Sequence, residues 1–171
     1  MKLIRLCAMA ALIAVGLAIT LFAQDAGNGA VVPMAGSKFV TPEGLPACSS
    51  LSTPYGDPFK GPSTILIKMK SSCLIPWHWH TASESLMIVS GKGKIEMKGE
   101  AAHNLSAGDF VYLPGKHVHQ FTCTATCTFF NRIEGVFDLH YVDKDGKEIT
   151  PAEALKSGAK PKAAAAPKAK K

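Results

Sequence analysis

Hydrophobic and polar residues alternate in short runs between about Thr64 and Val142, and Gly, Pro, Asn and Asp separate these runs. A period of two is typical of strands with one buried face, and no apolar stripe with the helical period of about 3.6 residues stands out. The predicted strands are Ile65–Met69, Pro76–His80, Leu86–Val89, Ile95–Met97, Phe110–Leu113, Val118–Cys123, Thr126–Asn131 and Val136–Val142. Short strands at this spacing predict an all-β domain, a sandwich or a barrel.

The segment before the first predicted strand, residues 24–62, is less regular and contains the turn-rich stretch Tyr55–Pro62. Its prolines argue against a central strand, because proline cannot donate a ladder hydrogen bond. We expect an arm that packs across the β-domain or against a partner subunit. After the last strand, Lys144–Lys147 predicts a turn, and Pro151 predicts the start of one helical turn within Ile149–Lys156.

The first 23 residues have the pattern of a secretory signal peptide. Lys2 and Arg5 precede an apolar run from Leu6 to Phe22, and small Ala23 follows before polar residues. An uncleaved anchor is the alternative, since about 17 apolar residues lie at the lower limit for crossing a bilayer. The small residue at the end of the run favours cleavage, and thus a secreted or periplasmic protein with no stable membrane partner.

The C-terminal residues from Lys156 onward are almost wholly Lys, Ala, Pro and Gly, a composition typical of disorder. The formal net charge of +6 belongs mostly to the two ends of the chain. Two of the 19 basic residues lie in the leader and six in the tail, which leaves 11 against 13 acidic residues between them. The folded part is therefore slightly acidic, so the high pI does not indicate a nucleic-acid partner.

Four cysteines remain when Cys7 of the leader is set aside: Cys48, Cys73, Cys123 and Cys127. An even number of cysteines in an exported chain predicts disulfides. A zinc site is the alternative, but the chain has no CxxC pair and the spacings differ from those of zinc fingers.

The most informative segment for chemistry begins at His78. His78 and His80 are two residues apart, so on a strand both imidazoles project from the same face. Glu84 follows after a bend, and His119 comes from a later strand. Three imidazoles and a carboxylate that converge inside a barrel form a ligand set for a divalent transition metal.

These residues resemble the two motifs of the cupin superfamily, G-x5-H-x-H-x3,4-E-x6-G and G-x5-P-x-G-x2-H-x3-N. The matching positions are His78, His80, Glu84 and Gly91 in the first motif, and Gly108, Pro114 and His119 in the second. The resemblance covers roughly residues 63–142 and is strongest to small secreted bacterial cupins of the type-2 conserved-barrel kind. It implies a single cupin jelly-roll β-barrel with an N-terminal arm and a disordered C-terminal tail.

Three positions depart from the cupin motifs. Ser72 stands at the first glycine, Gly115 carries the second-motif glycine one residue early, and Cys123 replaces the final asparagine. None of these is a metal ligand in the family, so the resemblance still implies His78, His80, Glu84 and His119 as ligands. The departure at Gly115 concerns the turn before His119.

The other histidines receive different interpretations. The family spacing from Pro114 places His117 in the turn at the rim of the site, with a ligand role in place of His119 as the alternative. His103 and His140 lie outside both motifs, and we interpret them as surface or packing residues.

Four protein ligands on a six-coordinate metal leave two positions for water, dioxygen or an oxygen-bearing substrate. The ligand set resembles that of the iron, manganese and nickel dioxygenases and oxalate-converting enzymes among cupins, and zinc is a further candidate. Glu84 is the candidate catalytic residue, either as a ligand or as a base. The leading hypothesis is a metal-dependent dioxygenase or oxidoreductase acting on a small oxygen-bearing molecule. The alternatives are a non-catalytic periplasmic binding module for a carboxylate or sugar acid, and a purely structural metal.

The residues expected inside the barrel are mostly apolar and serve as core or as a pocket wall, with core favoured. These are Ile65, Ile67, Met69, Phe110 and Phe121. Tyr112 and Gln120 are the polar candidates for the interior.

The resemblance also bears on the disulfides, because the second-motif strand of a cupin is followed by a turn. A hairpin at Thr124–Ala125 would bring Cys123 and Cys127 together and leave Cys48 to pair with Cys73. Pairing of Cys48 with Cys123 or with Cys127 remains the alternative.

The predicted organisation has five parts. They are a signal peptide (1–23), the arm (24–62), the cupin barrel (63–142), a C-terminal extension (143–155) and the tail (156–171). We expect a homodimer that exchanges the arm, with a small-molecule ligand and no nucleic-acid partner.

Overall fold

The structure is a computed structural model, and it describes residues 29–158. The predicted signal peptide and residues 159–171 of the predicted tail lie outside the described residues. The chain divides into two units, Met1–Val31 and Val32–Lys171, and all elements named below belong to the second.

The described part of this unit is built almost entirely of β-strands. Its elements are η1 (Met34–Gly36), β1 (Ser49–Gly56), β2 (Ser63–Met69), β3 (Leu74–Trp79), β4 (Glu84–Ser90), β5 (Lys92–Met97), β6 (His103–Ser106), β7 (Phe110–Leu113), β8 (His119–Cys123), β9 (Cys127–Ile133), β10 (His140–Tyr141) and α1 (Pro151–Gly158). The predicted all-β class is confirmed.

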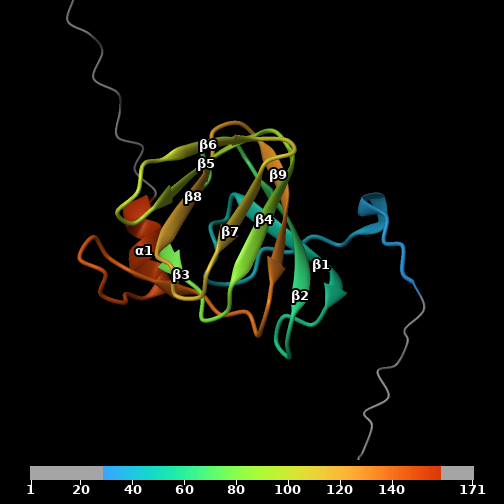
Figure 1. Cartoon of the computed structure of the whole chain (residues 1–171), viewed down its shortest axis with the longest axis horizontal. Coiled ribbons are helices and arrows are strands. Elements are labelled where there is room, and N and C mark those ends of the chain that lie inside the picture. Colours follow the sequence, from blue (N-terminus) through green and yellow to red (C-terminus); the bar gives the residue numbers. More distant parts are fainter. Residues whose placement is uncertain (1–28, 159–171) are drawn as a thin grey trace, which may run out of the picture. The chain divides into compact units, whose positions relative to one another are not determined.

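The strands form two antiparallel five-stranded sheets, ordered β1-β2-β9-β4-β7 and β10-β3-β8-β5-β6 (Figure 1). Most hydrogen-bonded neighbours are distant in sequence: β2 pairs with β9, and β3 pairs with β8. Side chains from the inner faces of both sheets make one hydrophobic core. This arrangement confirms the predicted jelly-roll β-barrel.

The two-residue alternation correctly identifies most of the core. Ile65, Ile67 and Met69 of β2 are buried, and Phe121 of β8 packs against Phe129 of β9 with ring centroids 4.7 Å apart. Alternation alone does not say which face is inside, and this explains one error. Phe110 is 61% exposed, so its assignment to the interior is wrong.

Three strand predictions need correction. The arm contains β1, an edge strand that pairs with β2 and meets Val40 at a single bridge on its other side, and its register with β2 shifts between Ser52 and Tyr55, around Pro54. A proline is tolerated there because an edge strand has a free side. The prediction missed β6, which pairs with β5, and the last predicted strand is reduced to the two residues of β10.

The disulfide pairing is confirmed. β8 ends at Cys123 and β9 begins at Cys127, and the turn between them brings the two Cα atoms to 5.7 Å in a bonded pair. Cys48 is bonded to Cys73, again with Cα atoms 5.7 Å apart. This second bond joins the arm to the loop just before β3, the strand that carries His78.

Two of the departures from the cupin motifs have a common backbone feature. Ser72 and Lys116 have φ angles of 64° and 65°, and they are the two non-glycine residues with positive φ in the described chain. Both occupy positions where the motif has glycine, the residue that adopts this conformation most readily. A side chain on Gly115 would collide with the carbonyl of Thr81, so close approach of the backbone explains this glycine.

The C-terminal helix α1 is longer than the single turn predicted and reaches Gly158, so it includes Lys156–Gly158 of the predicted tail. Thr150 and Glu153 form a capping box, with the Glu153 carboxylate accepting from the Thr150 N–H and the Glu153 N–H donating to the Thr150 hydroxyl. Within residues 29–158, no helix is long and apolar enough to cross a membrane.

Candidate metal centre

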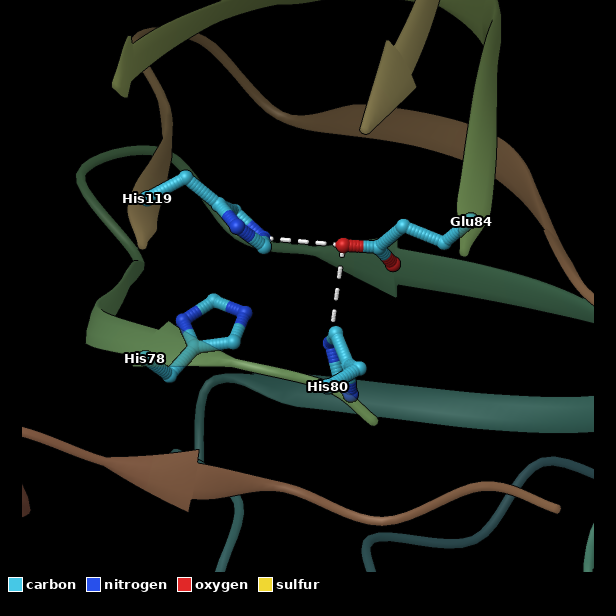
Figure 2. Close-up of side chains that lie close together, drawn as sticks. All are labelled: His78, His80, Glu84 and His119. Carbon is cyan, nitrogen blue, oxygen red and sulfur yellow. Dashed lines mark ion pairs between the residues drawn. The ribbon is translucent and has the colours of Figure 1, made fainter. Parts of the chain in front are cut away.

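Four side chains from both sheets meet inside the barrel (Figure 2). His78 lies on β3 directly opposite His119, the first residue of β8, so one sheet presents two imidazoles side by side. His80 follows immediately after β3. Glu84 is the first residue of β4 in the other sheet, and its carboxylate points back at the histidines.

The four residues form a tight cluster of ligand atoms. One nitrogen or oxygen from each lies within 4.8 Å of all the others, and all four residues are buried. Glu84 Oε1 is 2.9 Å from His119 Nε2 and 3.5 Å from His80 Nε2. The structure thus brings together every residue that the sequence analysis assigned to the metal.

Backbone carbonyls fix the orientation of all three imidazoles. The Nδ1 of His78 contacts the carbonyl of Pro76 at 2.6 Å, the Nδ1 of His119 contacts the carbonyl of His117 at 2.9 Å, and the Nδ1 of His80 contacts the carbonyl of Asp138. A carbonyl oxygen can only accept, so each Nδ1 must carry the hydrogen and donate. In the neutral rings, each Nε2 therefore has a free lone pair, and the Nε2 atoms of His80 and His119 face Glu84 Oε1.

A buried asparagine positions the carboxylate of Glu84. Asn131 of β9 donates from Nδ2 to Glu84 Oε2 at 2.7 Å, while Glu84 Oε1 has no hydrogen-bond donor within the described part of the chain. The contact between Oε1 and His119 Nε2 is favourable when a positive charge lies between the two atoms, either a proton on the imidazole or a metal ion. The sequence analysis missed Asn131, although a polar residue in the inward series with Phe129 and Ile133 was a signal for it.

The charges of the cluster suit a metal ion. Burial by itself would raise the pKa of Glu84, but His80, His119 and His78 outweigh it and lower this pKa to about 2. Burial lowers the pKa of His78 well below its usual value, and the neighbouring His119 and His80 act in the same direction. Glu84 is therefore ionised and His78 neutral at pH 7, which are the forms that coordinate metals.

The cluster lines a small cavity of about 40 Å³, which we call the metal cavity. This volume holds about three water molecules. Apart from the four clustered residues, the lining is apolar except for Asn131 and two serines of β1. Among the residues that the structure describes, no lysine or arginine lines this cavity.

A larger apolar space lies next to this cavity. It has a volume of about 380 Å³, and Glu43 is the one charged residue in its lining among residues 29–158. We call it the vestibule. The two spaces share a set of apolar side chains, the dividing wall, made of Leu45, Leu51, Ile65, Phe137 and Leu139.

The remaining histidines lie outside the cluster. His117 is half-buried, with its Nε2 3.5 Å from a carboxylate oxygen of Glu100. His103 is exposed on β6, and His140 stacks on Trp79 with ring centroids 3.9 Å apart. These positions agree with rim, surface and packing roles.

The two polar groups expected in the interior are not there. Tyr112 is 52% exposed, and its hydroxyl contacts Ser83 at 3.3 Å. Gln120 donates to Glu96 at 2.7 Å, and neither residue lines the metal cavity. Tyr112 and Gln120 each alternate with buried residues of their strands, so they lie on the outer faces.

These features define a small β-barrel with a buried cluster of three histidines and a glutamate. Residues 66–131 match the family model described as Cupin domain, a range that contains all four clustered residues. Together with the fold, this match shows that residues 66–131 form a cupin domain.

Solved structures of cupins have a similar fold. An RmlC-like cupin protein from Ralstonia eutropha JMP134 aligns with a TM-score of 0.58 at 18% identity, over 76% of this chain and 84% of that chain. An RmlC-like cupin from Shewanella frigidimarina NCIMB 400 aligns with a TM-score of 0.54 at 14% identity, over 69% of this chain and 96% of that chain. At these identities the similarity concerns the fold alone.

A curated relative is the DNA damage-repair/toleration protein DRT102 of Arabidopsis thaliana. It is 25% identical over 85 residues, which cover 49% of this chain and 27% of the plant protein. The match therefore spans only about a quarter of that relative's length.

Proposed function

We propose that His78, His80, Glu84 and His119 bind one divalent transition metal, and that the chain is a metal-dependent dioxygenase or oxidoreductase acting on a small oxygen-bearing molecule. The observation that carries this proposal is Glu84 Oε1, which faces imidazole nitrogens and for which the described residues supply neither a hydrogen-bond donor nor another charged group in the cavity. Imidazole with carboxylate suits Fe, Mn, Ni and Zn.

Such an ion, when bound, would supply a Lewis acid and, if redox-active, an electron donor with open positions for oxygen ligands. The protein contributes the rest. The three backbone carbonyls hold the imidazoles in one tautomer, and Asn131 holds Glu84 Oε2 so that Oε1 faces the centre. The apolar lining limits the water that reaches the site.

Glu84 is also the proposed base. While it contacts the imidazoles its pKa is about 2, which makes it a weak base. Movement away from them would remove the interactions that lower this pKa and leave burial, which raises it. A carboxylate that leaves the cluster would therefore gain basicity and take a proton from a nearby substrate hydroxyl.

The dimensions of the interior favour a substrate with an apolar body. The metal cavity of about 40 Å³ has room only for a small head group. The adjoining vestibule, at about 380 Å³, lies within the usual range of ligand sites. We infer that a substrate would place its oxygen atoms at the metal and its apolar part in the vestibule, on the far side of the dividing wall.

The alternative function, a non-catalytic module that captures a carboxylate or sugar acid, has less support. Proteins usually bind such anions with arginine or lysine side chains. The metal cavity has neither among the described residues, so the metal alone would have to hold the anion.

Metal analysis combined with oxygen-electrode assays tests the proposal. The substrates to screen are enediols, catechols, thiols and oxalate, and the variant is His119→Ala. We expect about one metal ion per wild-type chain and loss of both metal and oxygen consumption in the variant. His103→Ala, an exposed histidine outside the cluster, is the matched control and should behave as wild type.

Three further outcomes separate the possibilities. A metal-free wild-type protein that remains empty after reconstitution would contradict the metal site. Metal binding without oxygen consumption, together with tight binding of a carboxylate, would favour the binding module. A His119→Ala protein that keeps its thermal transition but lacks metal would show that the loss is local.

We also infer that the protein acts in an oxidising compartment, secreted or periplasmic. Two disulfides within one small domain support this inference, because such bonds are rare in the reducing cytosol.

A further inference from the structure

One of the two polar atoms of the Asn131 side-chain amide makes no hydrogen bond within the described residues. Asn131 is only 5% exposed, and it lines the metal cavity. Its Nδ2 donates to Glu84 Oε2, yet its Oδ1 has no hydrogen-bond donor among the described residues. A buried acceptor without a donor is costly, and native proteins rarely leave one in that state without a purpose.

The orientation of this amide is fixed by charge. As a metal ligand Glu84 is a carboxylate, and both of its oxygens can only accept. The Asn131 group that contacts it must therefore be the NH₂, and Oδ1 must point elsewhere. The residues opposite Asn131 on both neighbouring strands are Ile65 of β2 and Leu86 of β4, whose apolar side chains offer no donor.

We propose that Asn131 is a specificity-determining residue whose Oδ1 accepts a hydrogen bond from the ligand in the metal cavity. The ligand would therefore carry a hydrogen-bond donor, in the simplest case a hydroxyl, next to the oxygen that binds the metal. This inference rests on the proposed metal site and narrows its substrate class from any oxygen-bearing molecule to one with a neighbouring donor.

The free Oδ1 favours ligands with a donor at this position over ligands with an acceptor there. A ligand with an ether, a halogen or a second ionised oxygen at that position would face Oδ1 with a lone pair and leave it without a donor. A site built to pair with a hydroxyl rejects analogues that lack it, because the buried protein group is then left unpaired. A fixed acceptor beside the metal thus discriminates between ligands of nearly equal size.

The test compares two probes, catechol and 2-fluorophenol, in which one hydroxyl is replaced by a fluorine of similar size. Zinc-loaded protein is used, because zinc is redox-inert and no turnover disturbs the binding measurement. Affinities are measured by isothermal titration calorimetry for wild type, Asn131→Leu and Asn131→Thr. Leucine has a similar shape and no polar group, whereas threonine keeps a hydroxyl that can donate to Glu84.

We expect the wild-type preference for catechol over 2-fluorophenol to fall by at least about fivefold in both variants. Ser49→Ala is the matched control, because Ser49 also lines the cavity but its hydroxyl already donates to the Pro46 carbonyl at 2.7 Å. This control should keep the wild-type preference. A ratio of affinities is informative even where a variant binds zinc more weakly, since it is measured on loaded protein.

The outcomes separate this inference from the proposed function. If Asn131→Leu and Asn131→Thr bind zinc and keep the wild-type preference for catechol over 2-fluorophenol, the proposed role of Asn131 is wrong. Water would then be the hydrogen-bond donor to Oδ1, and the proposed metal site would be unaffected. Failure of wild type to bind zinc would overturn the proposed metal site and this inference with it. An equal drop in Ser49→Ala would also refute a specific role for Asn131.

Discussion

The buried carboxylate of Glu84 makes the stability of the metal-free protein depend on pH in a specific way. Its pKa is about 2 in the folded state, against an ordinary value of 4.5. A group with a lowered folded-state pKa stabilises the fold above its unfolded pKa, and this contribution disappears as the pH falls towards the folded pKa. The loss should therefore occur between pH 4.5 and pH 2.

The size of the effect follows from the difference between the two pKa values. Each pKa unit corresponds to about 1.4 kcal/mol, so the full contribution of Glu84, from 2.5 units, is about 3.5 kcal/mol. Between pH 5.5 and pH 2.5 the linkage relation gives a loss of about 2.5 kcal/mol. His78 acts in the same direction from about pH 6.5 downward, because its lowered pKa lets the unfolded state bind protons first.

The assay is urea unfolding of the metal-free protein with its disulfides intact, at pH 5.5 and pH 2.5, for wild type and Glu84→Gln. The variant has no carboxylate to titrate, so its free energy of unfolding should fall by about 2.5 kcal/mol less than that of wild type. Glu134→Gln, at an exposed position outside the cluster, is the control and should follow wild type. Parallel pH curves for wild type and Glu84→Gln would refute the ionised, buried state of Glu84.

Three further predictions concern the fold and its assembly. Ser72→Gly and Lys116→Gly should each stabilise the protein by up to about 1 kcal/mol in urea unfolding, because relief of the left-handed strain exceeds the entropy cost of glycine; unchanged or lower stability would contradict this strain. Breaking the Cys48–Cys73 bond, which joins residues 25 apart in sequence, should cost about 3.5 kcal/mol by the chain-entropy relation, and a loss below about 1 kcal/mol would argue against a tethering role. Light scattering at micromolar concentration should give the mass of a homodimer, and a monomer mass would count against exchange of the arm.

Most of the barrel could be predicted because local sequence determines it. Inward residues such as Ile65, Ile67 and Phe121 recur every second position, and this spacing is set by the strand itself. The cluster could be predicted because His78, His80 and Glu84 are close in sequence, and because the second cupin motif sets the number of residues between Pro114 and His119. The turn between Cys123 and Cys127 is likewise a local feature.

The features that the sequence analysis missed depend on contacts between segments that are distant in sequence. β1 contains Pro54, which opposes strand structure locally, and it becomes a strand only because β2 leaves an edge open for it. The burial of Phe110 and Tyr112 could not be assigned, since alternation defines two faces but not which one meets the core. Asn131 acquires its role only through Glu84, which lies 47 residues away in sequence.

The most direct test of the metal site is anomalous diffraction from a crystal of the metal-loaded protein. The account predicts one strong anomalous peak, about 2.0–2.2 Å from the Nε2 atoms of His78, His80 and His119 and from Glu84 Oε1. A peak bound through an Nδ1 atom, a peak that uses His117 in place of His119, or a fully loaded protein with its metal outside the barrel would contradict it.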